Sequence, residues 1–244
     1  RNKLVGTAQA HKVIAKKGNF LHIRHRPIFS SWKKHYLNYL IDYLKNLNQA
    51  EKTLFLRISP LIENNGENKK LFKEYGFIDS PIFAMDGEYC RILDLRKSEE
   101  EILSGMRKTT RYLIRQAQKL GVEIVKSRNP HDLDDFLLLY GQTAKRHSFV
   151  EHKGIREEFE QFLKDDQILL FKGFAHNKLL SAALIIFYNQ QAIYHHSASL
   201  ESPYPVNYLL QWEVIKEAKN RGKLHYNMWG VVADDNNTRH PWRG

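Results

Sequence analysis

The chain has 244 residues, 42% of them hydrophobic, so it is long enough for one large or two small domains and too apolar to be disordered. Its 38 lysines and arginines outnumber 27 acidic residues, and the formal net charge of +11 favours an anionic partner: nucleic acid, a phosphorylated small molecule or an anionic membrane surface. The single cysteine, Cys90, excludes an internal disulfide and suits a reducing cytoplasm.

The first half of the chain alternates short strands with helices. Ser30 and Ser31 stand where they can cap a helix, and Gly76 stands where it can end the next one. The spacing of apolar residues predicts strands at 20–24, 54–58 and 89–95, and helices at 32–47 and 69–75.

Residues 98–120 are predicted to form one long helix. Ser98 and Glu101 have the spacing of a capping box, in which each side chain bonds the backbone of the other, and Gly121 ends the helix. Its apolar stripe consists of Ile102, Met106, Leu113, Ala117 and Leu120.

The second half continues the alternation and adds hairpins. The longest apolar run, 179–188, is too short to cross a membrane and is predicted to be a buried strand, joined to the strand before it by a tight turn at 175–178. Strands are predicted at 122–125, 168–174, 179–187, 192–199 and 224–232, and helices at 133–146, 155–163 and 206–221. The sequence therefore predicts a mixed α/β fold with several hairpins, not a regular doubly wound sheet.

Basic residues follow one side of the predicted helix at 98–120. Arg107, Arg111, Arg115 and Lys119 are spaced by four, so they form a stripe about 120° wide on a helix. Because guanidinium groups suit phosphate oxygens, the stripe indicates contact with RNA or a pyrophosphate; the alternative is an ordinary solvated helix face. The predicted RNA-binding residues are Arg107, Lys108, Arg111, Arg115 and Lys119.

A second basic group lies at the end of the helix predicted at 133–146. Arg146 and His147 are followed by Lys153, and cations here could hold a diphosphate. The alternative is that C-terminal cations complement the helix dipole, which explains Arg146 and His147 but not Lys153.

The strand predicted at 192–199 carries Tyr194, His195 and His196. Strict alternation would put Tyr194 and His196 on one face and His195 on the other. Core packing and ordinary hydrogen bonding are the alternatives to a catalytic role. A metal is not expected, because no third ligand at a diagnostic spacing and no cysteine cluster accompany the histidines.

The junction 199–207 joins this strand to the next helix, whose N-terminus is a natural anion site. An acyl-CoA-binding acetyltransferase would usually carry a glycine-rich loop there, and this junction has no glycine. The chain also lacks the nucleophile-elbow, phosphate-loop and zinc-protease motifs. These observations favour a transferase that positions two substrates and does not use acyl-CoA as donor.

Several segments of the chain, which occur in the same order as in the family, resemble the FemABX family of peptidoglycan-bridge aminoacyltransferases. The stretch 107–121 is similar to a signature helix of that family, and the stretches 208–216, 226–230 and 240–244 match later motifs. Segments 55–60 and 75–77 are similar to its first domain. The resemblance covers nearly the whole chain.

The resemblance implies two tandem acetyltransferase-like (GNAT-type) domains with a cleft between them. We expect the domains at 1–120 and 121–244, and we expect a terminally truncated fragment that lacks the closing strand, because the sequence begins with Arg1 and the family continues past Gly244. The implied activity is transfer of an amino acid from aminoacyl-tRNA, as co-substrate, to an amine of a UDP- or lipid-linked muropeptide, without a cofactor. The implied location is the cytoplasm, with peripheral contact with the inner face of the membrane.

The resemblance also carries site residues. Lys153 is the nearest match to a phosphate-gripping arginine, His196 holds the place of an acceptor-site tyrosine, and Tyr194 matches a second tyrosine. The predicted catalytic residues are Tyr194 and His196, and the predicted substrate-binding residues are Lys153, Arg146, His147, Tyr208, Gln211 and Trp212.

Transfer to a lysine-type amine needs a proton acceptor, because such an amine has a pKa of about 10.4. His196, Tyr194 or the phosphates of the substrate could take this proton. Two other functions stay open: a non-catalytic module that binds RNA or an anionic precursor, and an aminoacyltransferase with a non-peptidoglycan acceptor.

Overall fold

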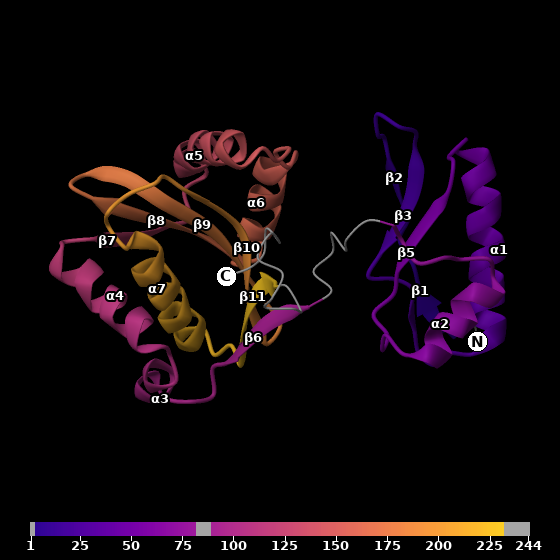
Figure 1. Cartoon of the computed structure of the whole chain (residues 1–244), viewed down its shortest axis with the longest axis horizontal. Helices are drawn as coiled ribbons and strands as arrows, with labels where there is room; N and C mark the ends of the chain where they lie inside the picture. The colour runs from indigo at the N-terminus through magenta and orange to yellow at the C-terminus, as the bar shows by residue number, and fades with distance from the viewer. Residues whose placement is uncertain (1–2, 82–88, 232–244) are drawn as a thin grey trace. The chain divides into compact units, whose positions relative to one another are not determined.

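The computed structural model describes residues 3–81 and 89–231, and the chain divides into two compact units, 1–88 and 89–244 (Figure 1). The division falls earlier than the predicted boundary at residue 120. The reason is long-range pairing: β6 (Cys90–Asp94) pairs with β11 (His225–Gly230), which brings the segment after residue 88 into the second unit.

The first unit is built on a three-stranded sheet and one long helix. Its sheet has the order β2-β3-β5, in which β3 runs antiparallel to β2 and parallel to β5. Leu21 and Ile23 of β3 pack against Leu44 of α1. Its elements are β1 (Gly6–Thr7), β2 (His11–Val13), β3 (Phe20–Arg24), β4 (Ile28–Phe29), α1 (Lys34–Ala50), β5 (Leu56–Ser59) and α2 (Gly66–Glu74).

The predicted serine cap of α1 is wrong. The N-cap residue is Lys33, which makes no side-chain cap bond. Ser30 lies instead at the end of a two-stranded ribbon of β1 and β4, where its backbone N–H donates to the Val5 carbonyl at 2.9 Å. The predicted end of α2 is supported, since Gly76 adopts a left-handed φ of +83°.

The second unit has a six-stranded sheet of order β6-β11-β10-β9-β8-β7. Among the strands that the structure describes in this sheet, only β10 and β11 pair in parallel, and α7 (Val206–Asn220) is the crossover between them. The other elements are α3 (Glu99–Ser104), α4 (Lys108–Lys119), β7 (Glu123–Ser127), the 3₁₀ turn Pro130–Asp132, α5 (Leu133–His147), α6 (Ile155–Lys164), β8 (Ile168–Ala175), β9 (Lys178–Tyr188) and β10 (Gln191–Ser199). None of the helices in the described residues is long and apolar enough to span a membrane.

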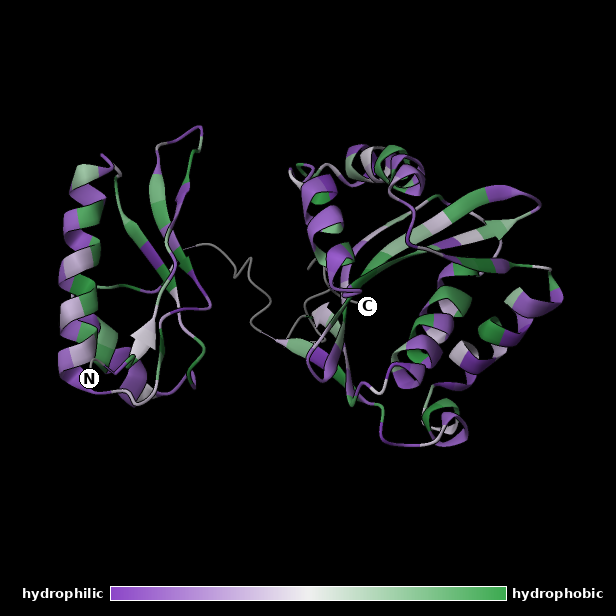
Figure 2. Cartoon of the chain, turned by 180° about the vertical axis from the view of Figure 1, so that it is seen from behind, coloured by the Kyte–Doolittle hydropathy of each residue, from purple (hydrophilic) through white to green (hydrophobic). Residues whose placement is uncertain are grey.

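Helices cover both faces of this sheet. The helices α3, α4 and α7 pack on one face, and α5 and α6 pack on the other (Figure 1). Strand β9 is apolar on both sides. Ala183, Ile185 and Phe187 face the core under α3, α4 and α7, whereas Leu184 and Ile186 face the core under α5 and α6. Figure 2 shows the long strands of this sheet coloured mainly hydrophobic, whereas the helices also carry hydrophilic stretches.

The segment predicted as one helix at 98–120 forms two. The capping box of Ser98 and Glu101 is confirmed at the start of α3, but α3 ends at Ser104 and α4 begins at Lys108. Arg111 stabilises the break, because its Nη1 donates to the carbonyls of Ser104 at 2.8 Å and Met106 at 2.7 Å. The predicted apolar stripe holds only in part, since Leu120 is exposed.

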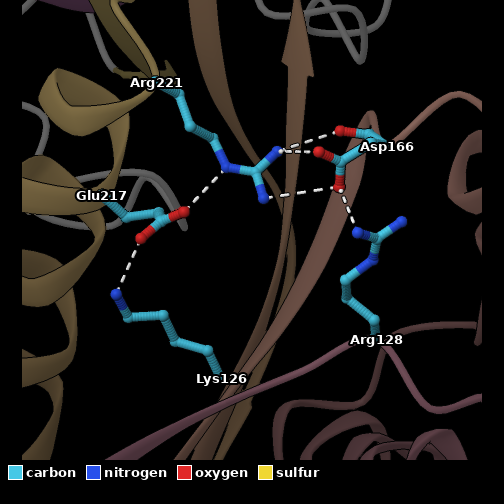
Figure 3. Close-up of polar contacts among 5 residues, drawn as sticks. All are labelled: Lys126, Arg128, Asp166, Glu217 and Arg221. Carbon is cyan, nitrogen blue, oxygen red and sulfur yellow. Dashed lines mark hydrogen bonds and ion pairs between the residues drawn. The ribbon is translucent and has the colours of Figure 1, made fainter.

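A chain of ion pairs fastens α7 to the edge of the sheet (Figure 3). Glu217 of α7 accepts from Lys126 of β7 at 2.7 Å and from Arg221 at 2.7 Å. Arg221 also pairs with Asp166 at 3.2 Å, and Asp166 pairs with Arg128 at 3.1 Å. Because these residues come from β7 and the residue after it, from α7 and its C-cap, and from the turn before β8, the network holds three separate segments together.

Candidate functional site

The strand β10 contains a bulge at its histidines. Tyr194 pairs with Ile185 and His196 pairs with Leu184, so His195 is an extra residue without a partner position on β9. The prediction that His196 shares a face with Tyr194 is therefore wrong. Tyr194 packs into the core under α7, whereas His195 and His196 both contact Glu158 of α6 on the opposite face.

Glu158 and the two histidines form a half-buried polar cluster. The Nε2 atom of His195 lies 2.8 Å from Oε1 of Glu158, and Nε2 of His196 lies 3.7 Å from Oε2. The exposed fractions of the side chains are 32% for Glu158, 20% for His195 and 11% for His196. Burial raises the pKa of Glu158, but its bonds to the two imidazoles outweigh burial and lower that pKa to about 2.

Aromatic rings frame the cluster. The ring of Tyr140, from α5, meets His196 edge-on at 5.9 Å, and the ring of His152 lies 5.2 Å from His196. Trp229 of β11 meets His195 edge-on at 6.0 Å. Burial raises the pKa of the Tyr140 hydroxyl. The imidazoles thus lie among aromatic side chains from two further elements of the fold.

The cluster lies where β10 and β11 separate. The two parallel strands pair only from Gln191 to Ile193 on β10, although β10 continues to Ser199 and β11 continues to Gly230. His195 and Trp229 both come after the last paired residues. The carboxyl ends of adjacent parallel strands are a common place for ligands to bind in α/β folds.

Tyr194 belongs to a hydrogen-bonded group on the other face of the sheet. Gln211 of α7 accepts from the Tyr226 hydroxyl at 2.6 Å and also bonds the Tyr194 hydroxyl, which contacts Ser197 as well. Burial raises the pKa of both tyrosines. The predicted catalytic residues Tyr194 and His196 are therefore not brought together.

The remaining residues predicted on α7 differ in accessibility. Trp212 is 5% exposed and packs in the core, so its ring does not form an open binding surface. Tyr208 is exposed and lines a pocket of about 290 Å³ at the start of α7. The pocket is lined by Leu180, Leu200, Ser202, Pro203, Tyr204, Pro205, Val206, Asn207 and Tyr208. The glycine-free junction thus surrounds a cavity at the N-terminus of a helix.

The basic residues at the end of α5 lie close to the carboxyl end of β10. Arg146 donates through Nη2 to the Ser199 carbonyl at 2.8 Å, and its Nε donates to Nε2 of His147 at 3.2 Å. Ser148 ends α5 in a left-handed conformation, and the exposed Lys153 lies two residues before α6 begins. Arg146 therefore tethers the α5–α6 loop, which carries Lys153, to β10.

The basic residues of α4 are not equivalent. Arg111 is half-buried and caps the end of α3, which gives it a structural role. Arg107 is the N-cap residue and not part of the helix. The side chains of Arg107, Lys108, Arg115 and Lys119 are exposed. Four of the five residues predicted to bind RNA are thus exposed, and the fifth, Arg111, is engaged within the fold.

Sequence reasoning missed Glu158. Glu158 lies 37 residues before His195, in the first turn of α6, where a glutamate is already accounted for by the helix dipole. No local motif marks it. Only the bulge in β10 and the packing of α6 on the sheet bring its carboxylate to the histidines.

The second unit has a GNAT-like acetyltransferase fold: a sheet with one parallel pair that separates beside a bulge. The chain aligns with a GCN5-related glucosamine N-acetyltransferase region of a fungal multi-domain β-N-acetylglucosaminidase at a TM-score of 0.53 and 9% identity, over 94% of this chain and 29% of that one. It aligns with the crystal structure of FemX at a TM-score of 0.73 and 18% identity, over 98% of this chain and 79% of that one.

The FemAB family model matches residues 84–165 and 157–240, and the chain belongs to the FemAB family. Its sequence is 23% identical over 213 residues to the UDP-N-acetylmuramoylpentapeptide-lysine N(6)-alanyltransferase of Weissella viridescens. That alignment covers 80% of this chain but only 63% of the length of the relative. The motif predicted at 240–244 lies outside the residues that the structure describes.

Proposed function

We propose that this protein transfers an amino acid from aminoacyl-tRNA to an amine of a UDP- or lipid-linked muropeptide. Membership of the FemAB family and similarity to an alanyltransferase that acts on a muramoylpentapeptide lysine support the acceptor class. The observation that carries the proposal is the bulge in β10, which turns His195 and His196 together toward Glu158. The two imidazoles, to which we assign proton acceptance, thereby lie at the separated ends of β10 and β11.

The reaction needs this group because the acceptor is protonated in solution. A lysine-type amine has a pKa of about 10.4, whereas an aminoacyl ester is already activated toward attack. In the proposed step the amine nitrogen attacks the ester carbonyl, the carbon–oxygen bond to the tRNA ribose breaks, and the ribose oxygen leaves as a hydroxyl. The ammonium form of the amine loses two protons: one is released to solvent before attack, and His196 accepts the other and delivers it to the departing ribose oxygen. The carboxylate of Glu158 stabilises the transient positive charge on His196.

Tyr194 is a poor candidate for this role. Burial raises the pKa of its hydroxyl, and that hydroxyl bonds Ser197 and Gln211 on the face away from Glu158. A tyrosine that accepts a proton must first ionise, which burial disfavours. We therefore assign proton acceptance to the histidine side of the sheet.

The positive charge of the chain supports the proposal that the donor is a tRNA and that the acceptor is a phosphorylated precursor. The net charge is +11, and Lys108, Arg115 and Lys119 present exposed cations along α4. Arg146 at the end of α5 and Lys153 in the α5–α6 loop suit the phosphates of a precursor. The glycine-free junction before α7 argues against acyl-CoA as donor. We place the reaction in the cytoplasm, with contact at the inner membrane face when the precursor is lipid-linked.

A transfer assay tests the proposal directly. The protein is incubated with tRNA charged with a labelled amino acid and with a UDP-linked muropeptide, and the product is followed by mass spectrometry. We expect the muropeptide to gain one aminoacyl residue, and we expect no product when its lysine amine has been acetylated. Binding of both substrates without transfer would favour the non-catalytic module, and transfer only to other amines would favour a non-peptidoglycan acceptor.

A further inference from the structure

Three side chains with metal-binding atoms converge in the cluster under α6. One oxygen of Glu158 and one nitrogen each of His195 and His196 all lie within 4.8 Å of one another. A regular strand would send neighbouring side chains to opposite faces, so the two imidazoles meet only because of the bulge at His195. The irregularity in the backbone is therefore what makes this donor set possible.

The spacing of these atoms is close to what a tetrahedral ion requires. Bonds of about 2.0–2.2 Å from zinc to nitrogen and oxygen place neighbouring ligand atoms about 3.3 Å apart. Nε2 of His195 lies 2.8 Å from Oε1 of Glu158, and Nε2 of His196 lies 3.7 Å from Oε2, the other oxygen of the same carboxylate. One ligand atom from each residue lies within 4.8 Å of the other two, so small rotations of the carboxylate and the imidazoles bring them to the tetrahedral spacing.

The surroundings hold the three groups in place. The ligands come from a strand and a helix that share one buried core, so their backbones are fixed relative to one another. The rings of Tyr140 and Trp229 pack edge-on against His196 and His195 and restrict how far the imidazoles can turn. All three side chains are at least two-thirds buried, which limits competition from water.

We propose that Glu158, His195 and His196 bind one divalent transition-metal ion, with Zn²⁺ as the reference ion and water in the fourth position. Two imidazoles and a carboxylate suit zinc and its first-row neighbours, whereas Mg²⁺ and Ca²⁺ prefer oxygen ligands. The ion replaces the hydrogen bonds that join the three side chains in the metal-free protein. The proposal that the three side chains bind a metal ion does not depend on the proposed transfer activity.

The effect of the bound ion on the transfer reaction rests on the proposed function. An ion bound through the histidine nitrogens occupies the lone pairs that would accept a proton from the amine. The metal-bound and proton-accepting states of the cluster therefore exclude each other, and Zn²⁺ inhibits transfer as it fills the site.

The test titrates ZnCl₂ into the untagged protein, first freed of metal with a chelator, and measures binding by calorimetry and by the visible spectrum of Co²⁺. We expect one ion per chain, no comparable binding of Mg²⁺, and at least a tenfold loss of Zn²⁺ affinity in each of His195→Asn, His196→Asn and Glu158→Gln. The matched control is His176→Asn in the β8–β9 turn, which is expected to leave the affinity unchanged.

Three results would each overturn the proposal. One is the absence of zinc binding by the folded wild-type protein. Another is binding that survives in the double variant His195→Asn, His196→Asn, because the ion would then lie elsewhere. Nitrogen NMR of the wild-type histidines gives a reading that does not depend on the stability of variants: Zn²⁺ must shift the resonances of His195 and His196, and shifts confined to other histidines would also contradict it.

Discussion

His195 and Trp229 face each other where β10 and β11 separate, with ring centroids 6.0 Å apart and ring planes at 82°. Both residues lie at irregular points of their strands, since the pairing of β11 with β6 shifts register between Asn227 and Gly230. Trp229 adopts a left-handed φ of +69°, which is unfavourable for a residue with a Cβ atom. The aromatic contact thus coincides with local backbone strain.

This strain predicts an unusual order of stability for two variants. Trp229→Ala and Trp229→Gly both remove the ring, but only glycine relieves the left-handed conformation. We expect the glycine variant to be more stable than the alanine variant by about 1 kcal/mol in urea denaturation. The opposite order would mean that the backbone relaxes once the ring is gone.

The two predicted catalytic residues should respond differently to substitution. His196→Asn removes the proposed proton acceptor and should lower kcat of transfer by about 100-fold or more. Tyr194→Phe removes a hydroxyl on the other face and should change kcat by only a few-fold, at a cost of about 1 kcal/mol in stability. Transfer kinetics and denaturation of both variants check this, and a greater kinetic loss in Tyr194→Phe would reverse our assignment.

Neutralising the exposed cations of α4 should weaken RNA binding. We expect the triple variant Lys108→Gln, Arg115→Gln, Lys119→Gln to bind tRNA less tightly and to reduce the slope of log K against log salt by up to about 2–3. The matched control is Lys45→Gln, Lys69→Gln, Lys70→Gln, which removes the same charge from exposed positions of the first unit. Equal losses of tRNA affinity in both variants would show that binding depends on the net charge of the protein and not on the position of the cations on α4.

Arg111 should behave unlike its neighbour Arg115. Arg111→Ala leaves the Ser104 and Met106 carbonyls without their donor and should cost about 1–2 kcal/mol of stability, whereas the exposed Arg115→Ala should cost less than about 0.5 kcal/mol. Thermal denaturation compares the two variants. Equal stabilities would mean that water replaces the guanidinium without loss.

The pair of Asp132 and Lys172 predicts sensitivity to acid. Lys172 is 8% exposed at its side chain and donates to Asp132 at 2.8 Å, and the bonds from Lys172 and Ser127 lower the pKa of Asp132. A carboxyl whose pKa is lower in the folded state stabilises the fold above its unfolded pKa, about 3.9, and loses this contribution as the pH falls.

Asp132→Asn should therefore destabilise the protein by about 2 kcal/mol at pH 7, a value that allows for the partial exposure of Asp132. The difference in unfolding free energy between wild type and variant should shrink as the pH is lowered from 6 to 3. A difference that stays constant over this range would show that the charge of Asp132 does not contribute.

Most elements of the fold could be predicted because their signals are local. β3 and the helices α5 and α6 follow from the spacing of apolar residues, and the turn at His176 and Asn177 follows from its composition. The errors concern contacts that periodicity does not encode, and they arise over short as well as long separations in sequence; the cap of α1, for example, is Lys33 and not a serine. The unit boundary depends on the pairing of β6 with β11, and the break before α4 depends on Arg111 reaching back to an earlier helix.

The candidate site was less predictable for the same reason. The histidines were identified, but their orientation depends on a bulge, which is defined by the register of a neighbouring strand. Glu158 carries no local signal, since its position beside the histidines depends on how α6 packs. The alternation of side chains along a strand assigns residues to the two faces of the sheet only where the strand pairs with its neighbour without a bulge.

The two-sided burial of β9 bears on how the second unit unfolds. Neighbouring residues of this strand belong alternately to the core under α7 and the core under α5 and α6, so neither core can open without disturbing the other. The second unit should therefore behave as a single cooperative block. In hydrogen exchange, the slowest amides of α5 and α7 should open together, with one common free energy and one common dependence on denaturant.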